Sequence, residues 1–343
     1  MGQESTGTSE TTREAAQKNF DYSDFNKQRP QHIKRFNPHF LTWFIGFFEG
    51  DGSVHCRDSN LRSGFSFNPV SKRADFEITQ HIDNIKVLQF IRKSFGFGKV
   101  MTYDKDGKKY ARFYTSKKEH ILKLVLLLNG NIVSAKRREQ FVEWLTGINQ
   151  GWRLSIPLKP WTAKVSLQNA WLSGFTEADG GFSTNSQNNF KASKDQKGNT
   201  RFRFTTKYYI TQDGELCLLT EIQQLTGATN KISQITNGHT KKLYNRLEIT
   251  SIEATDVLID YFNRFPLKGT RHIACLRWAR VHFYKKRHVV LNAGAAKTLA
   301  GLLEKLQDPG EAILLEAAAS LSVAEEQVLS SLPLIAPQSM TKS

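Results

Sequence analysis

Two short acidic segments of the chain have residue types and spacing that could support chemistry. "EGDG" at 49–52 ends the apolar run "FIGFF", and "EADG" at 177–180 ends "LSGFT". Both have an acid, a small residue, Asp51 or Asp179, and a glycine in the same order, 128 positions apart. Carboxylate oxygens are ligands that Mg²⁺ prefers. The repetition therefore indicates metal-assisted chemistry if the chain brings the two aspartates together.

The apolar runs before these acids suggest how that could happen. Apolar residues cover every side of a helix over 40–48, which predicts a helix buried all round. Gly46 and Gly50 are four residues apart, and Gly174 and Ala178 match them in the second run. Small residues at this spacing let two helix backbones approach closely. We expect the two helices to bury each other, with their C-terminal ends together.

Helices packed in this way would place Asp51 and Asp179 face to face. Two close carboxylates repel, and this raises the pKa of one of them unless a cation lies between them. Divalent ions held by carboxylates suit hydrolysis of a phosphodiester, where one ion activates water and another stabilises the leaving oxygen. The candidate metal site comprises Asp51, Asp179 and the residues before them, Gly50 and Ala178.

The first acid of each segment has a different expected role. Glu49 and Glu177 precede the aspartates by two residues and so point elsewhere on the helix. We expect them to hold backbone amides near the helix end. The segments are not calcium-binding EF-hand loops, because the alternating acids and the closing glutamate of that loop are missing.

The rest of the central chain also repeats once. "ITQ" at 78–80 matches "ITQ" at 210–212, an offset of 132, and Lys136 matches Arg271 at an offset of 135. Two copies indicate a pseudo-two-fold molecule, since a solenoid needs at least three repeats. Hydrophobic periodicity predicts an α+β fold with the order α-β-β-α-β-β-α in each half.

Changes in composition suggest boundaries between segments of the chain. Asn37-Pro38 is a good start for the first apolar helix. The expected segments are a disordered arm at 1–33, a first repeat at 34–150, a linker at 151–165, a second repeat at 166–289, and a helical or partly disordered tail at 290–343.

The central part of the chain is strongly basic. The whole chain has 48 Lys and Arg against 32 Asp and Glu. Residues 34–289 have 41 bases and 21 acids, a net charge of +20, whereas both ends are slightly acidic. A domain this basic usually meets a polyanion, and nucleic acid is the first candidate.

The three cysteines and the apolar stretches exclude other classes. No CxxC pair occurs, which argues against a zinc ribbon or a disulfide framework and fits a reducing compartment. No apolar stretch approaches the ~20 residues of a membrane span. The polar first residues do not resemble a signal peptide.

"FIGFFEGDG" at 44–52 and "LSGFTEADG" at 172–180 resemble the LAGLIDADG motif, and 34–289 is similar to a monomeric, two-repeat LAGLIDADG homing endonuclease. The resemblance implies a four-stranded antiparallel sheet in each half, and the two sheets forming a DNA-binding saddle. It also implies cutting of both DNA strands at a long asymmetric target, leaving 3′ overhangs. Two or three Mg²⁺ ions shared between the repeats would support the reaction, in an organelle.

The resemblance also assigns roles to residues around the metals. Asp51 and Asp179 would be catalytic metal ligands. Gln80 and Gln212 would position solvent, and Lys136 and Arg271 would offset charge that builds on the phosphate. Arg271 departs from the family pattern, in which lysine is commoner, so the halves are expected to act unequally.

DNA would be read by polar side chains on the strands, because Arg and Lys pair with guanine and Asn and Gln with adenine in the major groove. The candidates are His55, Arg57, Arg73, Arg112, Asn185, Gln187, Arg201, Arg203, Lys207 and Arg246.

Two other functions remain open on the same scaffold. One is an RNA-binding maturase that helps its host intron splice, with intron RNA as partner. The other is a DNA-binding regulator that does not cut. Asp51 and Asp179 are both intact, which favours cleavage of double-stranded DNA by a monomer.

Overall fold

The computed structural model describes ten stretches of the 343-residue chain: 20–28, 36–51, 64–185, 193–194, 200–201, 205–236, 243–286, 298–299, 301–303 and 305–306. For residues 51, 185, 193–194 and 200–201 it describes the backbone alone. The chain divides into two compact units, 1–181 with 208–273, and 182–207 with 274–343.

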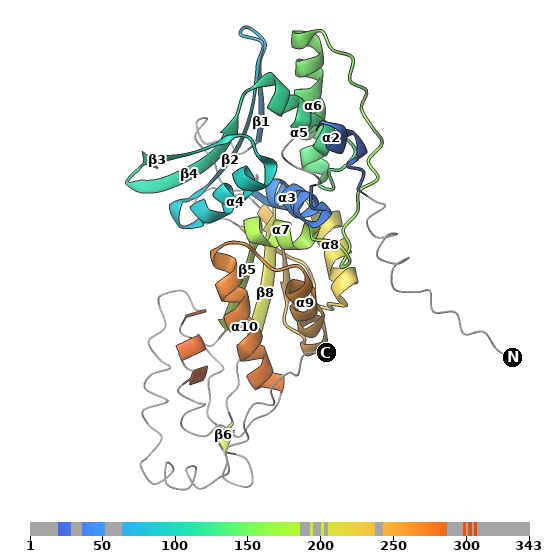
Figure 1. Ribbon diagram of the computed structural model, residues 1–343. Helices are drawn as coiled ribbons and strands as arrows, with labels where there is room; N and C mark the ends of the chain where they lie inside the picture. Colours follow the sequence, from blue (N-terminus) through green and yellow to red (C-terminus); the bar gives the residue numbers. More distant parts are fainter. Residues whose placement is uncertain are drawn as a thin grey trace, which may run out of the picture. The chain divides into compact units, whose positions relative to one another are not determined.

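The first half of the chain builds one four-stranded antiparallel sheet and its helices (Figure 1). After the short helix α2 (Ser23–Lys27), the elements are α3 (Pro38–Asp51), β1 (Gly64–Asn68), β2 (Arg73–His81), the 3₁₀ turn η1 (Ile82–Asn84), α4 (Ile85–Phe95), β3 (Lys99–Lys105), β4 (Lys108–Thr115), α5 (Lys118–Leu128) and α6 (Ala135–Trp152). The strand order is β1-β2-β4-β3.

The second half repeats this topology. Its elements are α7 (Trp171–Asp179), β5 (Gly180–Asn185), β6 (Ser193–Lys194), β7 (Thr200–Arg201), β8 (Thr205–Gln212), α8 (Leu216–Thr226), β9 (Ser233–Thr236), β10 (Leu243–Ile249), α9 (Ile252–Arg264) and α10 (Thr270–Lys286). The order β5-β8-β10-β9 matches the first sheet, and β6 and β7 pair separately. The predicted α+β fold with two four-stranded antiparallel sheets is therefore confirmed.

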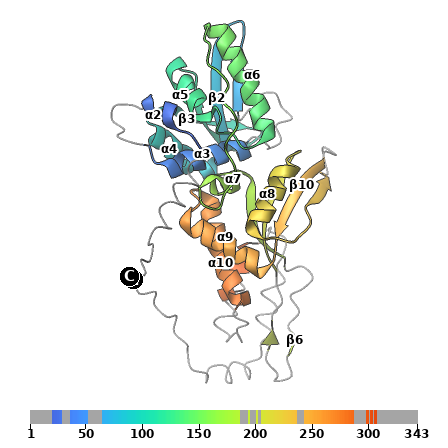
Figure 2. The same cartoon turned by 90° about the vertical axis from the view of Figure 1, so that its right-hand side faces the viewer.

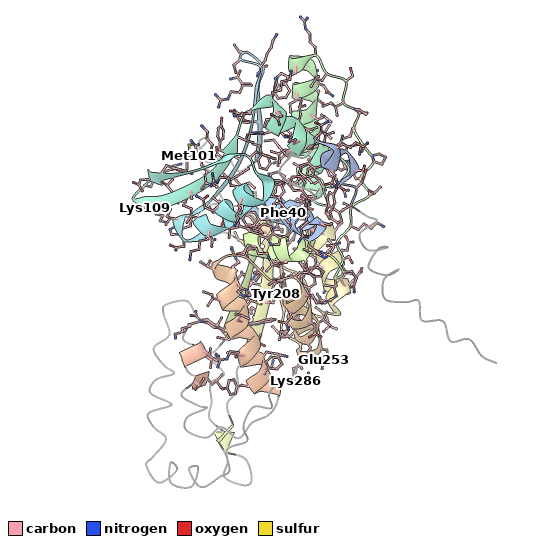
Figure 3. All side chains as sticks on the ribbon, in the orientation of Figure 1. Phe40, Met101, Lys109, Tyr208, Glu253 and Lys286 are labelled. Carbon is pink, nitrogen blue, oxygen red and sulfur yellow. The ribbon has the colours of Figure 1, made fainter. Side chains whose placement is uncertain are left out.

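Each sheet has one face packed on helices. Ala74, Phe76 and Ile78 of β2 are fully buried and alternate with more exposed neighbours. Helix α4 packs on β2, β3 and β4, and α6 packs on β1. The opposite face carries polar and aromatic side chains such as Glu77, Arg112 and Tyr114. Met101, labelled in Figure 3, is opposite Arg112 on the neighbouring strand and shares this face.

Local sequence explains where several elements begin and end. Asn37 Oδ1 accepts a hydrogen bond from the backbone N–H of His39, and Pro38 opens α3, as the sequence predicts. Helix α4 ends at Gly96 and α8 ends at Gly227, both in the left-handed conformation that glycine adopts without strain.

Residues 52–63, between α3 and the first sheet, lie outside the described residues. The first described strand of this sheet is β1, which lies farther along the chain and pairs Phe65 with Phe76.

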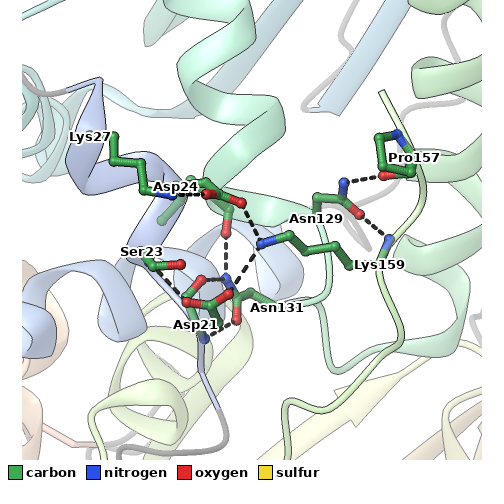
Figure 4. A network of polar contacts seen from close by, with 9 residues as sticks. Asp21, Ser23, Asp24, Lys27, Asn129, Asn131, Pro157 and Lys159 are labelled. Carbon is green, nitrogen blue, oxygen red and sulfur yellow. Dashed lines mark hydrogen bonds and ion pairs between the residues drawn. The ribbon is translucent and has the colours of Figure 1, made fainter. Parts of the chain in front are cut away.

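Part of the N-terminal segment is ordered and tied to the body, which corrects the expectation of a disordered arm for residues 20–28. Figure 4 shows the polar network that holds it. Asp21 N–H donates to Asn131 Oδ1, and Asn131 Nδ2 donates to the Asp21 carbonyl. Lys159 pairs with Asp21 at 3.1 Å and with Asp24 at 2.7 Å.

The chain between α6 and α7 is held by side-chain amides. Asn149 bonds both the N–H and the carbonyl of Ile156, and Asn129 bonds the Lys159 N–H. Near the other end, Leu299 and Leu303 belong to short helical pieces and are buried. No helix in the described part of the chain has both the length and the apolar character needed to cross a membrane.

Candidate active site at the ends of two packed helices

Helices α3 and α7 lie against each other, as both views show (Figures 1 and 2). A Cβ placed on Gly46 would lie 2.0 Å from the Trp171 carbonyl oxygen, and one on Gly174 would lie 1.9 Å from the Trp43 carbonyl oxygen. Real side chains cannot approach backbone this closely, so only glycine fits at both positions. The contact is reciprocal, like the contact across a two-fold axis.

The contact continues to the ends of the helices. A Cβ on Gly50 would lie 2.7 Å from the Ala178 Cβ. Asp51 and Asp179 follow these two residues directly, and each is the last residue of its helix. The backbone therefore brings both aspartates to one end of the interface, as the spacing of small residues predicts. The Asp51 side chain lies outside the described atoms.

The first acid of each motif holds the start of the last helix in its own half. Glu49 is 3% exposed and accepts hydrogen bonds from the N–H groups of Val133 and Ser134, just before α6. Glu177 is fully buried and accepts from the N–H groups of Lys268 and Gly269, just before α10. Both acids thus hold backbone amides, as expected.

Burial dominates the protonation of these acids. It raises the pKa of Glu49 to about 7, although the Ser134 N–H, the Trp171 indole and Arg137 favour the charged form. Burial also raises the pKa of Glu177, against the Gly269 and Lys268 amides. A charged group loses hydration when it is buried, and these donors replace only part of it.

Gln212 lies directly beside the second aspartate. Its Nε2 donates to Asp179 Oδ2 at 2.6 Å, across from the end of β8 to the end of α7. Gln80, the matching residue of the first half, accepts from Asn84 Nδ2 at 3.1 Å through its Oε1. The Asn84 side-chain oxygen in turn accepts from Thr270 Oγ1.

Lys136 reaches across to the strand end of the other half. Its Nζ lies 2.9 Å from Asp213 Oδ2, and Asp213 follows Gln212 in the chain. The Lys136 backbone N–H donates to Glu215 Oε1 at 3.0 Å. Neither Asp213 nor Glu215 stands out in the sequence, because single acids after a strand are common.

Arg271 does not mirror the Lys136 side chain. Its Nε donates to the Gly180 carbonyl at 2.7 Å, and its Nη1 donates to the Glu177 carbonyl. Arg137 makes the same kind of contact in the first half, donating to the carbonyls of Phe48 and Glu49. Each arginine thus caps the end of the motif helix of its own half, where cations are favourable.

These contacts bear on the repeat register near the last helices. By its contact with the motif helix, Arg137 corresponds to Arg271 at an offset of 134. Ser134 and Gly269, whose amides bind Glu49 and Glu177, are instead 135 apart, the offset that pairs Lys136 with Arg271. The apolar pattern supports 134, since Trp144 of α6 and Trp278 of α10 are seven residues after these arginines and both are buried. Arg137 was not among the predicted site residues, although its position on the buried face of this helix indicates that its side chain points inward.

Arginines on the open face of each sheet are held by acids and aromatic rings. Arg112 lies 3.2 Å from Glu77 and 5.6 Å from the centre of the Tyr103 ring. Arg73 binds Asp75 at 2.9 Å and also contacts the Tyr114 hydroxyl. Such contacts fix the side chains in place before any ligand binds.

The second sheet repeats one of these arrangements. Arg246 lies 2.9 Å from Glu248, with its guanidinium 4.1 Å from the Tyr209 ring centre. Arg112 is opposite Thr79 in the first sheet, and Arg246 is opposite Thr211 in the second. The two arginines therefore occupy equivalent positions beside the two "ITQ" segments.

Among the remaining DNA-binding candidates, Lys207 is half-buried on β8. The side chains of the rest are outside the described atoms. His55, Arg57, Gln187 and Arg203 lie outside the described residues, and only the backbone of Asn185 and Arg201 is described. Among the described side chains, no three His, Cys, Asp or Glu residues form a group that could hold a metal ion.

The described residues at the helix ends offer oxygen atoms. The Asp179 carboxylate is partly exposed, and the Gln212 amide beside it has a carbonyl oxygen. Hard divalent ions such as Mg²⁺ bind through a few carboxylate oxygens plus water and phosphate. This donor set fits such an ion, and the Lys136 ammonium lies 2.9 Å from Asp213, the residue after Gln212.

The chain matches one known family model over both halves. The model is described as "LAGLIDADG endonuclease" and matches residues 44–147 and 172–282.

Two curated relatives have intron-related names. The chain is 30% identical over 246 residues to "Probable intron-encoded endonuclease 4" of Neurospora crassa, covering 71% of this chain and 40% of the relative. It is 32% identical over 183 residues to "Intron-encoded RNA maturase bI4" of Saccharomyces cerevisiae, covering 50% of this chain and 25% of the relative. The chain thus spans less than half the length of either protein.

A solved structure shares the fold. The LAGLIDADG meganuclease I-AabMI bound to uncleaved DNA aligns with a TM-score of 0.54 at 19% identity, over 79% of this chain and 99% of that one.

Proposed function

Because the chain belongs to the LAGLIDADG endonuclease family, we propose that it is a site-specific endonuclease that hydrolyses both strands of a long DNA target. The observation that carries this proposal is the glycine contact between α3 and α7, which ends at Asp51 and Asp179. The basic central chain and the fixed arginines on the open sheet faces support DNA as the substrate.

Asp51 and Asp179 would hold divalent metal, which we propose to be Mg²⁺, with the backbone at Gly50 and Ala178 bringing them together. When bound, the metal would activate a water molecule and stabilise the negative charge that develops on the leaving oxygen. Gln212 would orient Asp179 and nearby solvent through its 2.6 Å contact. Lys136 would lie beside the phosphate and offset the charge that develops there.

The test uses the purified chain and a library of randomised DNA duplexes. In Mg²⁺ we expect cuts at one long sequence with 3′ overhangs, and no cuts in EDTA. The Asp179→Asn variant is the matched control and should bind the selected duplex without cutting it. Random degradation, or no cutting by the wild-type chain, would contradict the proposal.

A second function is favoured by the similarity to a protein named as an RNA maturase. In this reading the chain would bind the RNA of its host intron, with or without DNA cutting. The names of the relatives suggest an intron gene, and we propose an organelle as the location. A splicing assay with the host intron separates the functions, because Asp179→Asn should stop DNA cutting and leave splicing intact.

A further inference from the structure

A cavity lies beside α3, away from the helix end that carries Asp51. It is lined by the starts of α3 and α7, by Phe90 of α4 and by the segment from Arg264 to Lys268, all within the unit formed by 1–181 and 208–273. Trp43 is the lining residue nearest to Asp51 along α3 and precedes it by eight positions, about 12 Å along a helix. The cavity is therefore separate from the candidate active site.

Aromatic rings form much of the cavity wall. The Phe90 ring lies edge-on to two others, with its centre 5.5 Å from that of Phe40 and 5.8 Å from that of Trp43. Phe40 is labelled in Figure 3, and Phe265 adds a further ring, 5.4 Å from that of His39. The volume is about 150 Å³, and a cavity of roughly this volume holds one benzene ring. A flat group with a single ring therefore suits it.

Two buried polar groups on the wall have no hydrogen-bond partner among the described residues. They are the Trp43 Nε1–H and the Ser173 hydroxyl, on residues that are 1% and 0% exposed. A helical serine commonly donates to the carbonyl four residues before it. Here that carbonyl, of Asn169, accepts from the Tyr261 hydroxyl instead. Buried donors without acceptors cost free energy, so a ligand with acceptor atoms would gain by binding here.

The equivalent positions of the first half are satisfied or apolar. At the motif offset of 128, Trp171 matches Trp43, and its Nε1 donates to Glu49. Ile45 matches Ser173 and is fully buried. Both departures from the two-fold repeat thus lie on the wall of this one cavity.

The exposed part of the cavity lining is basic. His39, Arg264 and Lys268 line the cavity and are exposed, so they lie at its mouth. The position of Lys268 is held by Val133 in the first half, since each donates its backbone N–H to the first acid of its motif. The Lys268 ammonium lies 5.7 Å from the centre of the Phe90 ring, directly beside the aromatic wall. The second half therefore adds a positive charge where the first half has an apolar side chain.

We propose that this cavity binds a nucleotide with a single-ring base, such as uridine monophosphate (UMP). The base would lie among the aromatic rings, and its carbonyl oxygens would accept from Trp43 Nε1 and Ser173 Oγ. The phosphate would lie at the mouth beside Arg264 and Lys268. A simple aromatic acid satisfies less of the site, because its one anionic group cannot serve the inner donors and the outer cations together.

The same chemistry has two sources, a free nucleotide and an unpaired nucleotide of an RNA. The proposal does not depend on the endonuclease function, because no residue of the candidate active site takes part. Binding is therefore measured without any cutting reaction.

The test titrates the purified full chain with UMP, with adenosine monophosphate (AMP) and with inorganic phosphate, by calorimetry and by thermal unfolding. UMP should bind and raise the melting temperature. AMP has two fused rings and should bind at least about tenfold more weakly, since overpacking a site of this size is costly. Phosphate alone should have little effect.

Substitutions then assign the contacts. Lys268→Met should weaken UMP binding at least about tenfold, because it removes a charged partner of the phosphate. Trp43→Phe and Ser173→Ala each remove one inner donor and should weaken binding about fivefold. Neither should lower the melting temperature of the free chain appreciably, because the group removed has no partner among the described residues.

Two control variants separate binding from folding. Trp171→Phe is the matched change in the first half and should lower the melting temperature while leaving the affinity for UMP unchanged, because its N–H serves Glu49. Lys93→Met, at an exposed lysine of α4, should alter neither. Lower melting temperatures for Trp43→Phe and Ser173→Ala, with unchanged affinity for UMP, would show that these groups are structural and would overturn the proposal.

A uridine oligomer distinguishes the two sources. If it displaces UMP and loses affinity in Lys268→Met, the site takes an unpaired nucleotide of RNA, and if it fails to displace UMP, the site takes the free nucleotide. No binding of UMP, or binding of phosphate as tight as that of UMP, would overturn the proposal. Asp179→Asn should bind UMP like the wild type, so a failure of DNA cutting leaves this inference standing.

Discussion

The two motif helices make the same contacts through their backbones but not through all their side chains. Gly46 of α3 lies against the backbone of α7, and Gly174 of α7 lies against the backbone of α3 in the equivalent way. Trp171 Nε1 donates to Glu49 Oε1 at 3.0 Å, whereas the equivalent Trp43 Nε1 and Glu177 Oε1 are buried and have no hydrogen-bond partner among the described residues. Close packing thus sets the symmetry, and polar contacts depart from it.

The same division holds around the helices. The strand order, the arginine caps and the amide-binding acids occur in both halves. Polar residues near the helix ends differ, since Asp213, which pairs with Lys136, is matched by His81 in the first half. Features that determine the fold are duplicated, and some polar side chains around them have diverged.

The largest expected effect comes from adding a methyl group at the symmetric contact. Gly46→Ala and Gly174→Ala should each destabilise the protein by more than about 3 kcal/mol, because overpacking against backbone cannot be relieved by a side-chain shift. Thermal unfolding would measure this. Gly301→Ala is the control, since a Cβ there meets no atom within 4 Å. A well-folded Gly46→Ala protein would contradict the close approach.

The next effect is a pH dependence shared by the two halves. The pKa of Glu49 is raised to about 7 in the folded chain, above its usual 4.5, so the folded state binds this proton more tightly. Stability from this group should be fully present below about pH 4.5 and decline by about 3 kcal/mol as the pH rises to 7.

Chemical denaturation at several pH values tests this dependence. Glu49→Gln should flatten the pH profile, and Glu177→Gln should flatten it in the same direction, since burial raises that pKa too. A wild-type profile that is flat between pH 5 and 7 and falls only below about pH 4.5 would show that Glu49 is instead charged in the folded chain.

The equivalent arginines of the two sheets should contribute similarly to DNA recognition. Arg112→Ala and Arg246→Ala should each weaken binding to the selected duplex by about 1–3 kcal/mol and relax sequence preference at one position. Binding to duplexes with single base changes would show which position. Uniform weakening across all sequences would indicate a phosphate contact instead.

The smallest effect distinguishes the two tryptophans. Trp171→Phe removes a donor from Glu49 and should cost at least about 1 kcal/mol of stability. Trp43→Phe removes a buried N–H that has no partner among the described residues, so it should cost less or stabilise the protein. Equal losses in the two variants would show that the halves are more alike than this hydrogen bonding indicates.

Sequence patterns predicted the features that depend on packing. The all-round apolar helix, the small-residue contact and the two repeated sheets follow from periodicity and from the duplicated motif. The amide-binding role of Glu49 and Glu177 was also anticipated, because residues two positions apart on a helix point in different directions.

The missed features depend on side-chain direction. Three consecutive basic residues start α6, and the pattern of charges alone does not say which one turns inward. Arg137 is identified by the buried residues that follow it on the same face, Phe141 and Trp144. The acid–arginine pairs on the sheets join residues on different strands, such as Glu77 and Arg112, so they depend on strand register.

The most direct test of the shared site is the exchange of each aspartate for its neutral amide. Asp51→Asn, Asp179→Asn and the double variant would be compared with the wild type on the selected duplex in Mg²⁺, together with DNA affinity and melting temperature. Either single change should abolish double-strand cutting and leave binding and folding intact, with the double variant little worse than the singles. Double-strand cutting by Asp51→Asn at the wild-type rate would contradict a common site built from both helix ends.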